Sequence, residues 1–76
     1  MRFVLSHSIY PPTCLASAVS AYRDFCSVTL CESTGGASCI DIAPALPEYD
    51  ELRTAREFLN YLLDISLEAH LGETGL

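Results

Sequence analysis

The chain has 76 residues, of which 50% are apolar and 18% are charged, and its formal net charge is −6. At this length a single domain spanning residues 1–76 is expected, and the apolar content excludes an intrinsically disordered chain. Four arginines and no lysine exclude nucleic acids and anionic membrane surfaces as partners, because both are bound through many cations.

A membrane-spanning helix and a signal peptide are also excluded as interpretations. The apolar runs are only a few residues long, whereas a membrane helix needs roughly 20 apolar residues. The segment Met1–Ser8 breaks too early to be the apolar part of a signal peptide. We therefore expect a soluble cytoplasmic protein.

The first predicted elements are a strand and a helix. Residues 2–6 alternate in the way that favours a strand. Pro11 and Pro12 favour the start of a helix, because proline fixes φ near the helical value and the first turn needs no amide donor. Apolar residues then recur at helical spacing, which predicts a helix from about Pro12 to Phe25: Leu15, Ala18, Val19, Tyr22 and Cys26.

Two further strands are predicted around Gly35 and Gly36, which supply the backbone freedom of a tight hairpin turn. The strands are residues 27–32 and 38–43. One register places all the aliphatic residues on one face and polar residues on the other. It pairs Val28 with Ile42, Leu30 with Ile40, Thr29 with Asp41, and Cys31 with Cys39.

A long helix is predicted from about Tyr49 to Leu71, closed by Gly72 and followed by a frayed tail over residues 73–76. Its main apolar stripe contains Leu52, Ala55, Leu59, Leu62, Ser66 and Ala69. Further apolar residues make the apolar arc wider than one sheet face requires: Phe58, Tyr61, Leu63, Ile65 and Leu67. We therefore expect Tyr61, Leu63 and Leu67 to bind a partner.

These elements predict an α+β fold, a two-layer β-α-β-β-α sandwich with a three-stranded sheet and two helices on one face. The position of the third strand, between the other two or at an edge, stays open at this stage. In either arrangement one sheet face lacks a helix and one edge is free, and partners bind to both kinds of surface.

The four cysteines contain no Cys-x-x-Cys pair, so the sequence predicts no metal site. Cys31 and Cys39, as cross-strand neighbours, form a candidate thiol pair that would give a disulfide or half of a metal site. The alternative interpretation is that all the cysteines are free and buried or half-buried, as is common in cytosolic proteins.

No catalytic residue is predicted. His7 and His70 are far apart in the sequence, and neither has a visible partner that would make it a general base. Gly35-Gly36 is followed by no lysine, so it is not a phosphate-binding loop. We therefore expect a protein that is not an enzyme and that holds no cofactor.

Short segments of the chain, covering most of residues 2–68, resemble the HxsD-like family. They are Ser8-Ile9-Tyr10, Ala21-Tyr22-Arg23-Asp24, Ser27-Val28-Thr29-Leu30 and Glu57-Phe58-Leu59-Asn60-Tyr61-Leu62-Leu63-Asp64. The resemblance implies a non-catalytic protein of the His-Xaa-Ser systems, in which radical S-adenosylmethionine (SAM) enzymes modify ribosomally made precursor peptides. It implies a radical SAM enzyme and its precursor peptide as partners, with the iron–sulfur cluster held by the enzyme.

Two binding modes agree with this function. In one, Tyr61, Leu63 and Leu67 pack against the enzyme, and in the other the peptide pairs with an exposed strand. Homodimerisation is the alternative use of the same helix face. The alternative function is a self-standing dimeric interaction module, such as a regulator or antitoxin, that binds a basic partner. A redox switch at Cys31 and Cys39 is a third interpretation.

Overall fold

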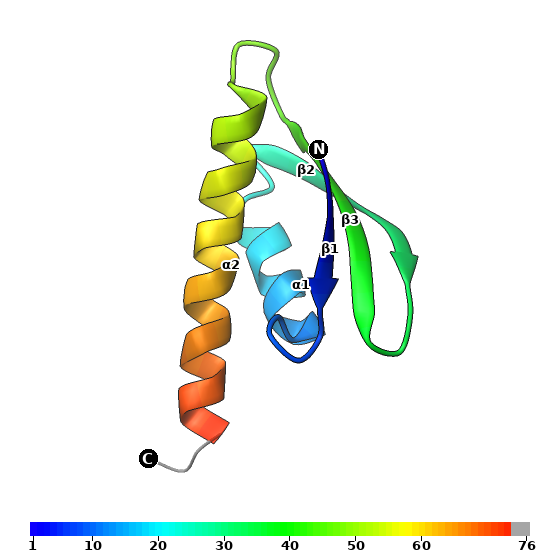
Figure 1. Cartoon of the computed structure of the whole chain (residues 1–76). Coiled ribbons are helices and arrows are strands. Elements are labelled where there is room, and N and C mark those ends of the chain that lie inside the picture. Colours follow the sequence, from blue (N-terminus) through cyan, green and yellow to red (C-terminus); the bar gives the residue numbers. More distant parts are fainter. Residues whose placement is uncertain (74–76) are drawn as a thin grey trace.

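The computed structural model describes residues 1–73 (Figure 1). In chain order its elements are β1 (Arg2–Ser6), α1 (Pro12–Ala21), β2 (Cys26–Ser33), β3 (Ala37–Pro44) and α2 (Glu51–Glu73). The predicted α+β fold is confirmed, with a three-stranded antiparallel sheet and two helices. The helices pack against the apolar face of the sheet, which contributes Leu5, Ile40 and Ile42 to the core.

The strands lie in the order β1-β3-β2, and both outer strands run antiparallel to β3. The strand order that the sequence left open is thereby settled, with β3 in the centre. Its position agrees with its burial, since Ile40 and Ile42 of β3 have almost no exposed surface. Consequently β1 and β2 are the two edge strands.

The predicted hairpin register is confirmed for the first part of β2 and wrong for the rest. Val28 pairs with Ile42 and Leu30 with Ile40, but a bulge then sets Glu32 opposite Cys39. Cys31 is therefore the extra residue of the bulge and not the direct partner of Cys39.

The bulge has a physical cause in the turn that follows β2. The Thr34 amide donates to the Ala37 carbonyl, at 2.9 Å, which closes a loop of two glycines. This closure fixes a register that differs by one residue from the register required by the aliphatic face. One additional residue in β2 satisfies both, because a bulge places two residues opposite one.

Both predicted helices have different ends in the structure. The first was expected to reach Phe25 but ends at Ala21, and residues 22–25 form turns in which the Tyr22 carbonyl accepts the amides of Phe25 and Cys26. This early end lets the chain reverse, so that Cys26 enters β2 as a buried residue.

Helix α2 begins at Glu51 because the Asp50 carboxylate caps it, accepting the Arg53 amide at 2.9 Å. Its end was expected at Leu71 with Gly72 as the cap, but the helix continues to Glu73. The rest of the predicted frayed tail, residues 74–76, lies outside the described residues.

The core-facing stripe of α2 is rotated from the predicted one. Phe58, expected beside the main stripe, is completely buried, whereas Leu52, expected within it, is exposed. The buried stripe faces α1 and β3 and consists of Thr54, Ala55, Phe58, Leu62 and Ser66.

Candidate functional site

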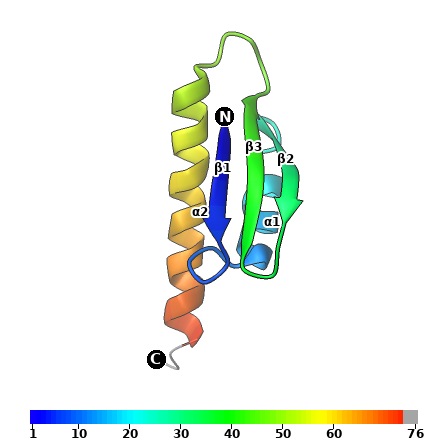
Figure 2. The same cartoon turned by 45° about the vertical axis from the view of Figure 1, so that its right-hand side comes forward.

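One edge of the sheet offers a binding surface along β2. This strand pairs only with β3, so its other side carries backbone amides and carbonyls that no strand of residues 1–73 pairs with. Figure 2 shows β2 at the edge of the sheet away from α2, with α1 behind it. An edge of this kind is the template to which an extended peptide adds.

An apolar groove of about 410 Å³ runs between β2 and α1. Leu30 on β2 faces this groove and is 57% exposed, because neither helix covers it. Ile40 is the buried floor. The groove is lined by His7, Pro12, Leu15, Ala16, Val19, Val28, Leu30, Ser33, Ser38 and Ile40.

A hydrogen bond marks the polar side of this groove. His7 Nε2 lies 2.7 Å from the hydroxyl oxygen of Ser38, whose residue is only 5% exposed. The pair keeps a buried hydroxyl satisfied, as buried polar groups require. His7, which directly follows β1, is thus a hydrogen-bonded residue at the end of the first strand.

A second hollow of about 280 Å³ continues the groove toward the start of β2. The two hollows share Val19 and Val28. The second one adds Arg23, Cys26 and Ala45 to the wall. Together they form a surface that follows most of the length of β2, which we call the β2 groove.

The predicted thiol pair lies on the other face of the sheet. Cys31 is exposed in the bulge and Cys39 is half-buried on β3, and both are free thiols. The pKa of the Cys39 thiol is raised by loss of hydration and by the neighbouring Cys31. The two residues are neighbours without a disulfide, so neither contributes to the β2 groove.

The predicted partner-binding residues do not form one surface. The Tyr61 ring is turned inward, with its centroid 5.2 Å from that of Tyr22. Leu63 and Leu67 are 37% and 52% exposed and lie four residues apart, on one face of α2. We call Leu63 and Leu67 the leucine face, and it excludes Tyr61.

Two classes of feature are not found in the part of the chain that the structure describes. Residues 1–73 bring no three histidine, cysteine or acidic side chains together as a candidate metal site. Neither of the two helices in this range combines the length and apolarity needed to cross a bilayer.

Comparison of the chain with protein-family models, curated proteins and solved structures finds no significant match.

The β2 groove was not predicted from the sequence. The available signal was the aliphatic face of the hairpin, which pairs Leu30 with Ile40. Helix α1 has only ten residues and leaves part of this aliphatic face, at Leu30, uncovered. Only the placement of α1 shows which part of the face stays open.

Proposed function

We propose that this protein is a non-catalytic accessory protein of a radical SAM enzyme, and that it binds an extended segment of the enzyme's precursor peptide along β2. The observation that supports the proposal best is the coincidence of a free strand edge with an apolar groove beneath it. The resemblance of the chain to the HxsD-like family supports the enzyme class.

Strand addition explains why both features are needed. Main-chain hydrogen bonds to a free edge supply affinity for any extended peptide, and pockets for alternate side chains supply specificity. A peptide paired with β2 directs every second side chain toward α1. Those side chains would meet Leu15, Val19 and Leu30, so the groove selects apolar residues at alternate positions of the peptide.

The enzyme requires a surface of its own. Helix α2, which carries the leucine face, lies on the other side of β1 and β3 from β2 (Figure 2), so one protein can hold peptide and enzyme at the same time. An amphipathic helix commonly binds a larger protein by such a face. We assign the leucine face to the enzyme, which would also supply the iron–sulfur cluster and all the chemistry.

The experiment is purification of the tagged protein from its native source, without oxygen and with reductant. Copurification of a brown, iron-containing protein and a short peptide is the expected result. Hydrogen exchange on that complex should then show new protection of the outward-facing amides of β2. If only a small basic protein copurifies, the alternative function as a regulator or antitoxin replaces the proposal.

A preparation that contains this chain alone also contradicts the enzyme assignment. Its oligomeric state then decides between a monomer and a homodimer formed through the leucine face. Protection that is confined to β1 after peptide binding would contradict strand addition at β2, even if the enzyme copurified.

A further inference from the structure

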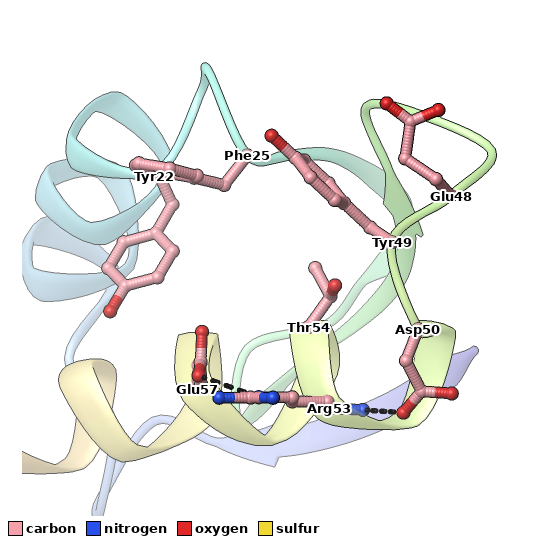
Figure 3. Close-up of a pocket in the computed structure, with 8 residues that line it drawn as sticks. All are labelled: Tyr22, Phe25, Glu48, Tyr49, Asp50, Arg53, Thr54 and Glu57. Atoms are coloured by element: carbon pink, nitrogen blue, oxygen red, sulfur yellow. Dashed lines mark hydrogen bonds and ion pairs between the residues drawn. The ribbon is translucent and has the colours of Figure 1, made fainter.

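A separate cavity of about 410 Å³ lies between the turn after α1, the loop before α2 and the first turns of α2 (Figure 3). The β2 groove does not include it. Its walls are unusual in combining three aromatic rings with three carboxylates. The lining residues are Tyr22, Phe25, Glu48, Tyr49, Asp50, Arg53, Thr54 and Glu57.

The aromatic rings of the cavity are packed on the core at Tyr22 and exposed to solvent at Phe25 and Tyr49. The Tyr22 ring contacts the rings of Phe58 and Tyr61 in the core, at centroid distances of 5.9 Å and 5.2 Å. Phe25 packs edge-on against Tyr22 at 6.0 Å but is still 53% exposed. Tyr49 forms the opposite wall and is also exposed. The cavity therefore presents two partly exposed rings on a rigid base.

The charge of the cavity is negative. Its one cation, Arg53, has Nε 3.4 Å from a carboxylate oxygen of Glu57. No cation of residues 1–73 forms an ion pair with Glu48 or Asp50. The pKa of Tyr22 is raised by burial and by the nearby charge of Glu57, in agreement with a dehydrated, negative surrounding.

A largely buried threonine lies at the base of the cavity. Thr54 is only 9% exposed, and its side chain points into the cavity in Figure 3. Its hydroxyl makes no hydrogen bond to any described residue of the chain, whereas its amide donates to the Asp50 carbonyl. The hydroxyl, which is open to the cavity, therefore keeps its capacity to donate and accept a hydrogen bond with a ligand.

We propose that this cavity binds one arginine side chain of a partner, with the guanidinium plane against Phe25 and Tyr49 and its N–H groups donating to Glu57 and the Thr54 hydroxyl. The proposal is independent of the radical SAM assignment and of strand pairing, because it concerns a single side chain.

Arginine fits this cavity better than the other cations. Its planar guanidinium stacks on aromatic rings while its edge donates several hydrogen bonds, whereas a lysine ammonium is a compact point charge. The carboxylates do not gather as metal ligands in the described chain. The cavity also suits no anion, since its three carboxylates face a single arginine.

The cavity adjoins the β2 groove at one end. Phe25 lines the cavity, and the next residue, Cys26, lines the groove. The Ala45 amide donates to the Phe25 carbonyl, at 2.9 Å, which ties the residue after β3 to the residue before β2 at this point. A partner peptide that pairs with β2 and extends past Cys26, the first residue of this strand, would thus place its next residue at the cavity.

The test is titration of the isotope-labelled protein with N-acetyl-arginine amide, followed by amide chemical shifts. N-acetyl-citrulline amide is the matched probe, because it has nearly the same shape without the charge. We expect arginine to shift the signals of Phe25, Tyr49 and Thr54, and citrulline to leave them in place. Equal shifts with both probes, or shifts spread over all acidic residues, would overturn the proposal.

Variants then identify the contacts. Glu57→Gln should weaken arginine binding about tenfold, since hydrogen bonds to charged groups are the strong ones. Thr54→Val removes the hydroxyl and keeps the shape of the side chain, so binding should weaken while the fold persists. Glu68→Gln removes an exposed charge elsewhere on α2 and should have little effect. Equal weakening by Glu68→Gln and Glu57→Gln would refute a specific site.

Discussion

The His7 ring and the Ser38 hydroxyl are joined by a hydrogen bond of 2.7 Å, which connects the end of β1 to the central strand beside the β2 groove. Ser38 is buried and His7 is half-buried. Substitution of His7 and substitution of Ser38 should therefore change the free energy of unfolding by different amounts. A group in contact with water recovers its lost partner, whereas a buried group does not.

Removal of the ring is thus the more damaging change. His7→Ala leaves the buried hydroxyl unpaired and should lower the free energy of unfolding by about 1 to 3 kcal/mol. Ser38→Ala lets the His7 ring turn to water and should cost only about 0.5 to 1.5 kcal/mol. Urea unfolding of both variants and of the double variant measures the coupling. Strictly additive effects would show that the bond does not contribute.

Substitutions of Leu30 and Thr29 test the β2 groove, with Thr29 as the matched control position. Leu30 faces the groove and Thr29 the opposite sheet face, and both residues are exposed. Leu30→Asn should reduce binding of the peptide proposed as the partner at least about tenfold, because it removes an apolar side chain that the bound peptide would bury. Thr29→Asn introduces the same side chain at the preceding position of the strand and should leave binding unchanged. Isothermal titration provides the comparison, and an equal loss in both variants would contradict the groove.

Leu63→Asp combined with Leu67→Asp tests the leucine face of α2. Both side chains are exposed, so circular dichroism and stability should change little while copurification of the enzyme is lost. Ser17→Asp with Ser20→Asp adds the same charge on the exposed face of α1 and serves as the control. Retention of the enzyme by the leucine variant would exclude this face as the docking surface. A change from dimer to monomer without the enzyme would indicate homodimerisation.

Ser66 lies fully buried in α2, and its hydroxyl has no hydrogen-bond partner among the described residues. An unsatisfied buried hydroxyl costs about 1 to 3 kcal/mol. Ser66→Ala should therefore raise the unfolding free energy by about 1 kcal/mol, after the loss of some packing. Ser20→Ala, at an exposed position, should change it by less than about 0.5 kcal/mol. A less stable Ser66→Ala variant would show that the hydroxyl is satisfied in solution.

The thiols predict a pH dependence of both reactivity and stability. Burial raises the pKa of Cys26 above the ordinary thiol value of 9.0, and loss of hydration together with Cys31 raises that of Cys39. Both thiols should therefore alkylate more slowly in the folded protein than in urea. Since the unfolded chain releases these protons first, their contribution to stability is complete below pH 9.0 and declines above it.

A change at the bulge tests the origin of the Cys39 shift. Cys31→Ser removes the neighbouring thiol, so the alkylation midpoint of Cys39 should move down toward the ordinary value. Alkylation at a series of pH values, read by mass spectrometry, gives both midpoints. An unchanged Cys39 midpoint would show that loss of hydration alone causes the shift.

Local patterns in the sequence were sufficient for the elements and much of their pairing. Alternation placed Val28 against Ile42, and the proline pair started α1 at Pro12. These features depend on neighbours along the chain or across one tight turn, where a period of two or of 3.6 residues decides which side is buried. The sequence alone therefore determined the α+β class and the hairpin.

The tertiary structure decided everything that depends on distant segments meeting. It placed β3 in the centre, turned Tyr61 inward onto Tyr22, and put the bulge at Cys31 to reconcile the turn with the aliphatic face. It also brought Phe25 beside Thr54 at the cavity, although 28 residues separate them. No sequence period encodes such contacts, because they arise from the packing of whole elements against one another.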